Sequence, residues 1–331
     1  MPPINAAIFI LTQNTDVRRV YLKTSLYFTF KHFNAECRYP IIIFHEGDYD
    51  DVAQRDIIMS VRSSCRSLVT FRAIDTSDFV LPSYIDADKV RRCVAAKVTP
   101  YWRNENYRKM CRWWLMCMPK YATGYDYVMR LDDDSIIEEP VPDLFEWAKE
   151  KDLVYASNIL HADCGLCCYG MKEFFTNRFP DKGDTIEKLF ISQEVSSRLT
   201  QFHAFRSVLS ITRDPIPEIT EKFTVSAPIM YYNNFFITKT DFWLRQDVKD
   251  LMDAIDRDGS IFYFRWGDAP LQTLITMIVA GSHRVSRAVF KYSKRMQREA
   301  FVGDNGDIHS YMPALYTQTS CITDNKPLPS G

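Results

Sequence analysis

Three short apolar segments in the first 75 residues, separated by segments of helical spacing, constrain the fold most. The apolar segments are AAIFIL (6–11), YPIIIFHE (39–46) and SLVTFRAI (67–74). Between them lie DVRRVYLKTSLYFTFKHF (16–33) and DVAQRDIIMSVRSSC (51–65), in which apolar residues recur at helical intervals. Short, nearly continuous apolar strands are typical of a buried parallel sheet. This β-α-β-α-β order therefore predicts an α/β fold in which helices cover both faces of the sheet.

Strand and helix patterns continue along the chain. NENYRKMCRWWLMCMPKYA (104–122) predicts an aromatic-rich helix, and YDYVMRL (125–131) and DLVYASNIL (152–160) predict further strands. APIMYYNNFFITKTDFW (227–243) predicts a strand, a turn and the start of a helix, and IFYFRWGDAPLQTLITMIVAG (261–281) an aromatic stretch, a tight turn and an apolar helix. In such a sheet, ligands bind beyond the carboxyl ends of the strands.

Charge and composition exclude several classes of protein. The chain has 331 residues, 46% of them hydrophobic and 25% charged, which is a soluble globular composition. A net charge of −1 gives no global field that would attract nucleic acid or an anionic membrane. The apolar run Ala6–Leu11 is too short for a signal peptide or a membrane span. We expect no membrane segment in this chain, and a missing upstream anchor is left open.

Nine cysteines are scattered along the sequence. An odd, dispersed set in a long chain does not indicate a disulfide framework, although one or two bridges remain open. The cluster CGLCC (164–168) has metal-like spacing, but no second Cys or His pair lies at the distance of a zinc finger. Buried thiols are the expected outcome.

Three consecutive aspartates, Asp132, Asp133 and Asp134, follow the predicted strand 125–131. They could form a solvated turn or helix cap, a paired-carboxylate acid–base site, or a site for Mg²⁺ or Mn²⁺, which prefer oxygen ligands. Their place at the end of a central strand favours the metal. The first and third carboxylates would share one side of an extended turn, with Asp133 pointing away. Such a metal would bridge a diphosphate, as in sugar transfer from a nucleotide sugar and in some phosphodiesterases.

Four motifs around this turn carry a resemblance to a known family. NYRKMCRWW (106–114), YDYVMRLDDD (125–134), MYYNNFFITKTDFW (230–243) and FYFRWGDAPLQT (262–273) resemble, in order and approximate spacing, the fungal Golgi α-1,2-mannosyltransferases of glycosyltransferase family 15. The resemblance covers roughly residues 5–280.

The resemblance implies a single GT-A domain over residues 1–331. A Rossmann-like nucleotide-sugar half would cover about residues 5–150 and an acceptor half about 151–331. It implies GDP-mannose as donor and a saccharide or glycoprotein as acceptor. The chain would be cytoplasmic if it is complete, and in the Golgi lumen if an N-terminal anchor has been removed.

The resemblance also implies a metal site for Mn²⁺ or Mg²⁺. The family's Glu-Pro-Asp motif falls on Asp132, Asp133 and Asp134, so Asp132 and Asp134 would be metal ligands. The family's late histidine ligand best matches His309 in GDIHSYMP, and His283 lies closer in sequence to RWGDAP.

Further residues would contact the donor. Tyr107 matches a family tyrosine near the nucleotide and the reaction centre, and Arg108 and Arg112 would be basic residues nearby. Tyr107 as a core ring, and one of the arginines paired with an acid, are alternatives. Asn234 would contact sugar or diphosphate, beside Asp132.

On the acceptor side, three residues are candidates. Asp268 in RWGDAP could cap a helix, since Pro270 suits a first helical turn, and it could also bind or deprotonate the acceptor hydroxyl. Trp266 could form a wall for a sugar ring or pack in the core. His161 follows a strand where the family has an acceptor-facing loop.

Departures from the family concern the sugar chemistry. Phe236 stands where the family has a glutamate proposed as nucleophile, so a double displacement through this position is excluded. An acid of the family is replaced by Phe264 and a basic residue by Gln13. Three routes remain open: front-face retention, a different carboxylate (Asp268 or Asp133), or inversion with Asp268 as general base.

Alternative functions are a non-catalytic nucleotide-sugar-binding relative, a transferase using another nucleotide sugar, and a metal-dependent phosphodiesterase. The phosphodiesterase predicts more His and Asp ligands near the acidic turn than the sequence offers.

Overall fold

The structure is a computed structural model that describes residues 4–196, 200–216, 222–294, 300–302 and 308–311. Its strands are β1 (Ala6–Leu11), β2 (Ile41–His45), β3 (Val69–Ala73), β4 (Tyr127–Leu131), β5 (Ser135–Ile137), β6 (Tyr155–Ala162), β7 (Phe190–Ser196), β8 (Lys222–Lys239), β9 (Val285–Arg287), β10 (Tyr292–Lys294), β11 (Ala300–Val302) and β12 (Ile308–Tyr311).

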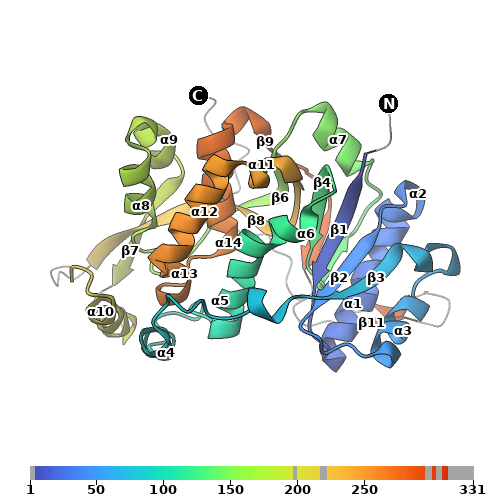
Figure 1. Cartoon of the computed structure of the whole chain (residues 1–331), viewed down its shortest axis with the longest axis horizontal. Coiled ribbons are helices and arrows are strands. Elements are labelled where there is room, and N and C mark those ends of the chain that lie inside the picture. The colour runs from blue at the N-terminus through green and yellow to red at the C-terminus, as the bar shows by residue number, and fades with distance from the viewer. Residues whose placement is uncertain (1–3, 197–199, 217–221, 295–299, 303–307, 312–331) are drawn as a thin grey trace.

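The α-helices of the described residues connect and cover these strands (Figure 1). They are α1 (Asp16–Thr29), α2 (Ala35–Cys37), α3 (Asp51–Met59), α4 (Ala87–Ala95), α5 (Glu105–Arg112), α6 (Met118–Ala122), α7 (Leu144–Glu150), α8 (Met171–Arg178), α9 (Gly183–Glu187), α10 (Thr200–Thr212), α11 (Thr240–Leu244), α12 (Gln246–Asp258), α13 (Ser260–Tyr263) and α14 (Asp268–Ile275).

Among the described residues, one mixed sheet of eight strands forms the centre of the molecule. Its order is β3-β2-β1-β4-β8-β6-β9, and β7 pairs with β8 off this path. The pairs β1–β2, β2–β3 and β1–β4 are parallel, as predicted from the first half of the sequence. β8 runs antiparallel to β4 and β6, so it is reversed within the sheet, while β6 and β9 run in the same direction as β4.

Two apolar cores lie on opposite faces of the sheet, because alternate residues of each strand point to opposite sides. In β1, Ala7 and Phe9 belong to the core that also holds Trp113 and Trp114 of the π-helical turn after α5. Ile8 and Ile10 belong to the core that includes Leu22 and Leu26 of α1 and residues of α7. Every residue of β4 is buried, so the three aspartates that follow it begin at the end of a central strand.

Two details differ from the sequence prediction. Residues 227–239 contain no turn, because they form the end of the 18-residue strand β8. The predicted helix 104–122 forms as α5 and α6 joined by the π-helical turn Trp113–Cys117, with Asn104 capping α5 by accepting a hydrogen bond from the Tyr107 backbone N–H.

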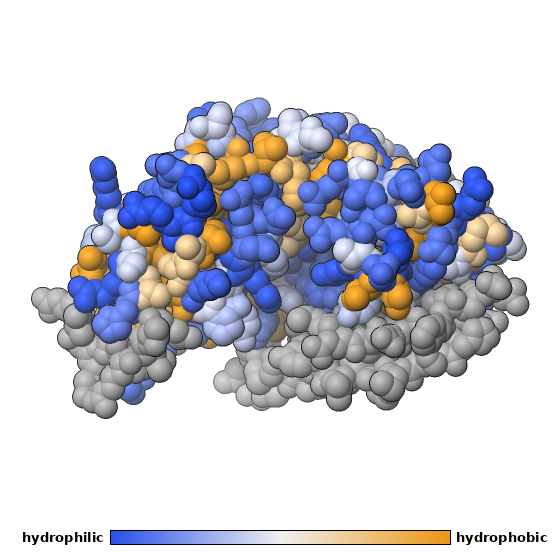
Figure 2. Space-filling view, turned by 90° about the horizontal axis from the view of Figure 1, so that it is seen from below, coloured by the Kyte–Doolittle hydropathy of each residue, from blue (hydrophilic) through white to orange (hydrophobic). Residues whose placement is uncertain are grey.

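The surface and the cysteines agree with a globular protein. None of the helices in the described ranges is long and apolar enough to cross a membrane. The described part of the face in Figure 2 is mainly hydrophilic, with apolar residues in scattered patches. The eight cysteines that the structure describes are free thiols, and those of CGLCC include the buried Cys167 and Cys168. Within the described residues, no group of His, Cys, Asp and Glu side chains has the arrangement of a metal site.

Candidate functional site

The carboxyl end of β4 carries a chain of charged hydrogen bonds. Arg130 Nε donates to Asp132 Oδ1 at 2.8 Å, and Arg130 Nη1 donates to Asp268 Oδ2 at 2.5 Å. The Arg130 guanidinium also lies 4.2 Å from the centre of the Trp114 ring. Arg130 and Asp268 are buried, and charge-assisted bonds of this kind are among the strongest in proteins. Arg130 therefore fixes the acidic turn relative to the RWGDAP segment.

Asp268 is the first residue of α14, and the residue that precedes the helix is Gly267. The prediction that Asp268 caps this helix with its side chain is wrong, since the helix start has no side-chain cap. The carboxylate instead accepts from Arg130 and, at 2.7 Å, from Asn233 Nδ2. Asn233 lies in β8, where the β6–β8 register shifts, and its amide also contacts Gln272 of α14. The carboxylate is thus oriented by side chains from two strands, β4 and β8.

Asp133 points away from its two neighbours, toward the first strand and helix. Its Oδ2 accepts from Thr12 Oγ1 at 2.6 Å and its Oδ1 from Arg18 Nη1 at 2.6 Å. Thr12 directly follows β1 and Arg18 lies in the first turn of α1, so these bonds join the ends of two parallel strands. With both oxygens engaged, Asp133 is a poor candidate for attack on a sugar.

Lys294 contacts both of the other aspartates. Its Nζ donates to Asp132 Oδ2 at 2.9 Å and lies 3.4 Å from Asp134 Oδ1, outside hydrogen-bond geometry. The lysine belongs to β10, where it stands opposite Ser135 in the antiparallel pair with β5. The side chains of Lys294 and Asp132 are 17% and 19% exposed, against 5% for Asp134, so solvent reaches the cluster mainly at Lys294 and Asp132.

Burial and the neighbouring cations shift the pKa values of the three aspartates in different directions. Burial disfavours ionisation of Asp132, but Arg130 and Lys294 outweigh it and hold the pKa below its usual value. Burial raises the pKa of Asp133, with Arg18 and Thr12 opposing, and raises that of Asp134 to about 6, with Lys294 opposing. Burial also opposes the charge of Lys294, yet Asp132 and Asp134 raise its pKa well above the usual value. Asp132 and Lys294 therefore form a stable ion pair.

The described residues do not fit a divalent cation at this turn. Asp132 and Asp134 are suitable oxygen donors, but the ammonium group of Lys294 already lies between them. In the part of the chain that the structure describes, no third His, Cys, Asp or Glu completes a metal-binding group. The predicted ligand His309 has its backbone in β12, and its side chain lies outside the described residues. His283 is exposed, in the turn Ser282–Arg284 after α14.

The two arginines predicted at the donor are tied into the fold. Arg108 is fully buried, and its guanidinium donates to the carbonyls of Phe262 and Trp102 at 2.5 and 2.7 Å. The expectation that Arg108 contacts the nucleotide is corrected, because its side chain holds α13 against α5. Arg112 forms a bidentate pair with Asp256 of α12, both bonds at 2.8 Å, which confirms the alternative that one arginine pairs with an acid.

Tyr107 remains near the candidate site. It is half-buried, one turn before Cys111, and Arg103 lies 5.6 Å from its ring. Burial raises its pKa, with Cys111, Arg265 and Asp268 as the charges next in influence. The buried Asn234 has an Nδ2 with no hydrogen-bond partner among the described residues, and its backbone carbonyl accepts from the Asp132 backbone N–H at 2.8 Å.

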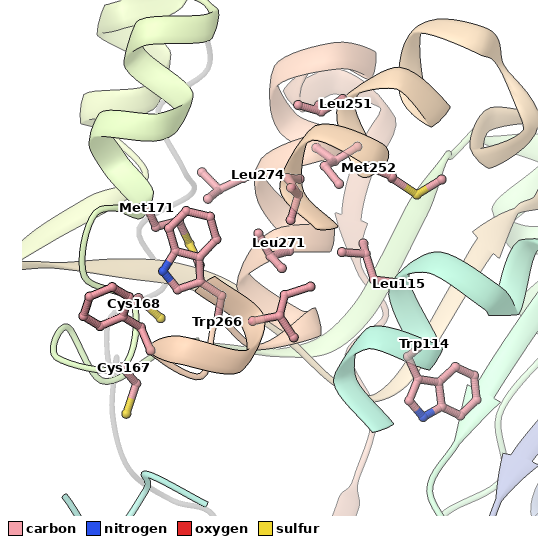
Figure 3. Packing of buried hydrophobic residues seen from close by; sticks show 14 of the residues in the cluster. Trp114, Leu115, Cys167, Cys168, Met171, Leu251, Met252, Trp266, Leu271 and Leu274 are labelled. Carbon is pink, nitrogen blue, oxygen red and sulfur yellow. The ribbon is translucent and has the colours of Figure 1, made fainter. Parts of the chain in front are cut away.

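Trp266 is a core residue, and its assignment as a sugar-facing wall is corrected. It is 2% exposed, its indole N–H donates to the Tyr169 carbonyl, and its ring packs edge-on against Phe174. Figure 3 shows it beside Met171 and Cys168, among buried apolar side chains. Arg265 before it pairs with Asp163 at 2.6 Å and fixes this loop. His161, in β6, is partly buried and lies edge-on to the Tyr232 ring, and its Nδ1 has no hydrogen-bond partner in the part of the chain that the structure describes.

Phe236 and Phe264 lie in aromatic surroundings. Phe236 is fully buried, stacked on Tyr155 and edge-on to Trp114, and Phe264 packs against Tyr169 and Phe205. Both phenylalanine side chains therefore contribute to the packing of the apolar core.

Sequence reasoning missed four residues of the cluster: Arg18, Arg130, Asn233 and Lys294. Arg130 had a usable signal, since a basic residue inside an apolar strand two positions before an aspartate requires a buried acidic partner. The segment KYSKR around Lys294 gives no such signal, because its pairing with β5 joins residues far apart in sequence.

Comparison with known proteins adds the family. A family model described as glycolipid 2-alpha-mannosyltransferase matches residues 2–288, which is most of the chain. The chain belongs to this family. The resemblance of the four sequence motifs is thereby confirmed.

Curated relatives in this family include glycolipid 2-alpha-mannosyltransferase 1 of Candida albicans, 23% identical over 278 residues, and O-glycoside alpha-1,2-mannosyltransferase omh1 of Schizosaccharomyces pombe, 24% identical over 285 residues. The matches cover 82% and 84% of this chain, and 58% and 65% of those relatives. The chain thus corresponds to somewhat less than two thirds of their length.

Two solved structures share the fold. Core-mannan synthase A of Aspergillus fumigatus, in a Mn/GDP form, aligns with a TM-score of 0.67 at 17% identity, over 87% of this chain and 74% of that protein. Mannosyltransferase Ktr4p of S. cerevisiae, in complex with GDP, aligns with a TM-score of 0.68 at 19% identity, over 88% and 72%. The predicted GT-A fold, a mixed and mainly parallel sheet flanked by helices, is confirmed.

Proposed function

We propose that this protein is a glycosyltransferase that moves a hexose, mannose from GDP-mannose, to a hydroxyl group of a saccharide or glycoprotein acceptor. Family membership supports the reaction class, and the GDP complex of Ktr4p supports the nucleotide. The observation that carries the proposal in this chain is the bonded series Asp132–Arg130–Asp268–Asn233 beyond the carboxyl end of β4. Ligands bind at this position in open α/β sheets.

The two halves of this series suggest two roles. Asp132, the more exposed end, faces the nucleotide side formed by the ends of β1 and β4, which we assign to about residues 5–150. Asp268, on α14, lies in the half that we assign to the acceptor, about residues 151–331. We assign Asp268 to the acceptor side, where hydrogen bonds from Arg130 and Asn233 orient its carboxylate. Tyr107 and Asn234 lie beside this series.

The structure also bears on the routes that the sequence leaves open. Double displacement through Phe236 is excluded, because this ring is sealed between Trp114 and Tyr155. Asp133 is engaged through both oxygens by Thr12 and Arg18. Front-face transfer, in which the leaving diphosphate accepts the acceptor's proton, and inversion with Asp268 as base remain, and the stereochemistry of the product distinguishes them.

Manganese is suggested for this chain by the Mn/GDP form of core-mannan synthase A. Lys294 disfavours a bound manganese ion, because a divalent ion on Asp132 and Asp134 would be repelled by its ammonium group. We therefore derive no step through a metal.

A nucleotide panel followed by turnover tests the proposal. Nucleoside diphosphates and nucleotide sugars are screened by thermal shift with and without Mn²⁺, and the donor with the largest shift is used for transfer to saccharide acceptors. GDP and GDP-mannose should raise Tm, and Asp268→Asn should lower kcat at least tenfold at unchanged GDP affinity. Glu146→Gln, on the distant helix α7, is the matched control. Nucleotide binding with no transfer or donor hydrolysis across the panel would instead favour a non-catalytic binding protein.

A further inference from the structure

The positive charge at the acidic turn is supplied by the chain itself. Lys294 Nζ lies 2.9 Å from an oxygen of Asp132 and 3.4 Å from an oxygen of Asp134, the pair that would hold a divalent ion in a D-x-D site. Asp134 Oδ1 is buried and makes no hydrogen bond with the described residues, so its charge is compensated by the ion pair with Lys294 and, to a smaller extent, by Arg18. A buried carboxylate needs such compensation.

The position of Lys294 is held by its own strand. β10 pairs with β5, the strand that directly follows the three aspartates, and Tyr292 and Lys294 stand opposite Ile137 and Ser135. The Tyr292 hydroxyl also bonds the Ser135 hydroxyl, at 2.5 Å. These contacts fix the backbone on both sides of the ion pair, so the ammonium group is presented to Asp132 by rigid structure.

A divalent ion and this ammonium group exclude one another. A Mg²⁺ ion bound to Asp132 and Asp134 would lie about 2.0–2.1 Å from the oxygens that Lys294 faces, and Mn²⁺ would occupy the same position. Two cations on the same oxygens repel, and the cation that is covalently attached to the fold is present at any metal concentration.

The lysine also retains donors for a ligand. An ammonium group has three N–H donors, and within the described residues Lys294 uses one of them in a hydrogen bond, to Asp132. Its side chain is 17% exposed, on the side where Asp132 also reaches solvent. A diphosphate bound beyond the end of β4 would find these N–H donors available.

We propose that Lys294 is the resident cation of the Asp132–Asp134 pair, and that the protein binds the diphosphate of its nucleotide donor through this ammonium group without a divalent metal. The second part rests on the proposed function, because it presupposes a nucleotide donor. The first part concerns the carboxylate pair alone and is tested without any nucleotide.

Calorimetric titration with MnCl₂ tests the carboxylate pair. The wild-type chain should show no Mn²⁺ site that depends on Asp132, whereas Lys294→Ala, which frees both carboxylates, should bind Mn²⁺ at least tenfold more tightly. Lys291→Ala removes a lysine that is 76% exposed in the same segment and should behave as wild type. Tm is recorded for each variant.

The proposal is overturned if wild-type protein binds Mn²⁺ and Asp132→Asn abolishes that binding, or if folded Lys294→Ala gains no Mn²⁺ site. Heat that persists in Asp132→Asn comes from another site and supports the proposal. If Lys294→Ala fails to fold, the wild-type and Asp132→Asn titrations still decide, because neither requires that variant.

Thermal shift with GDP tests the nucleotide part. The wild-type shift in Tm should be the same in EDTA and in Mn²⁺, while Lys294→Ala should lose it in EDTA and regain it in Mn²⁺. A wild-type shift that appears only with Mn²⁺ contradicts the proposal. If no nucleotide shifts Tm under any condition, the proposed function fails, and the Mn²⁺ titration still decides the role of Lys294.

Discussion

Arg130 and Phe236 stand directly opposite each other across the β4–β8 pair, and their surroundings differ completely. Arg130 belongs to a network of acids and cations that reaches solvent at Asp132, whereas Phe236 is sealed among aromatic rings. Trp114 contacts both, with one arginine over its ring and one phenylalanine at its edge. Trp114 therefore borders both the polar site at Arg130 and the apolar position 236, where the related family has a glutamate proposed as nucleophile.

The largest effect should follow from placing a charge on the closed side. Phe236→Glu buries a carboxylate opposite Arg130, whose guanidinium is already bonded to Asp132 and Asp268, so the added charge is poorly compensated and should lower the free energy of unfolding by about 3 kcal/mol or more. Urea denaturation measures this change. Phe236→Leu keeps the site apolar and should cost about 1–2 kcal/mol. A Phe236→Glu protein as stable as wild type would show that Arg130 compensates the added carboxylate, and would remove the contrast between the two positions.

An intermediate effect is expected for Arg108, which the sequence placed at the donor. Arg108→Met leaves the carbonyls of Phe262 and Trp102 without their donor and should cost about 2–3 kcal/mol, because unpaired buried acceptors are expensive. The affinity for GDP, measured by calorimetry at a temperature where the variant is folded, should not change. Arg91→Met, on an exposed arginine of α4, is the control. A selective loss of GDP affinity at unchanged stability would return Arg108 to the donor site.

The smallest effect concerns the pH dependence of Asp134. Burial raises its pKa to about 6, so the folded protein holds this proton more tightly than the unfolded chain does. Stability from this group is therefore present at low pH and decreases as the pH rises from about 4 to about 6. Asp134→Asn cannot ionise, so its Tm relative to wild type should be a few degrees higher at pH 7.5 than at pH 4.5. An equal difference at both pH values would mean that Lys294 fully compensates the charge.

The sequence predicted the strands and the place of the acidic turn because their signals are local. An apolar run followed at once by Asp132–Asp134 identifies both a core strand and its exit from the sheet. Arg108 and Arg112 illustrate what local pattern cannot decide: both lie on α5, yet one binds backbone carbonyls and the other binds Asp256. Those outcomes depend on α12 and α13, which come more than 100 residues later.

The role of Lys294 was beyond sequence reasoning for the same reason. Its partner Asp132 lies 162 residues earlier, and the contact exists only because β10 pairs with β5. The cap prediction for Asp268 was wrong by one position. Asp followed by Ala-Pro is typical of a helix start, but it does not decide whether the Asp precedes the helix or is its first residue. Gly267 occupies the preceding position, which leaves the carboxylate available to Arg130.

The length of β8 has a consequence for any attempt to divide this protein. Its 18 residues pair with β4, β6 and β7, so this strand alone joins the parallel strands of the first half to those of the second. A fragment that stops before residue 222 would expose the whole edge of β4, a fully buried apolar strand. Unprotected edges of this kind recruit other chains, so such a fragment should aggregate and not fold as a nucleotide-binding unit. The two halves of the site can be mutated separately, but they cannot be produced separately.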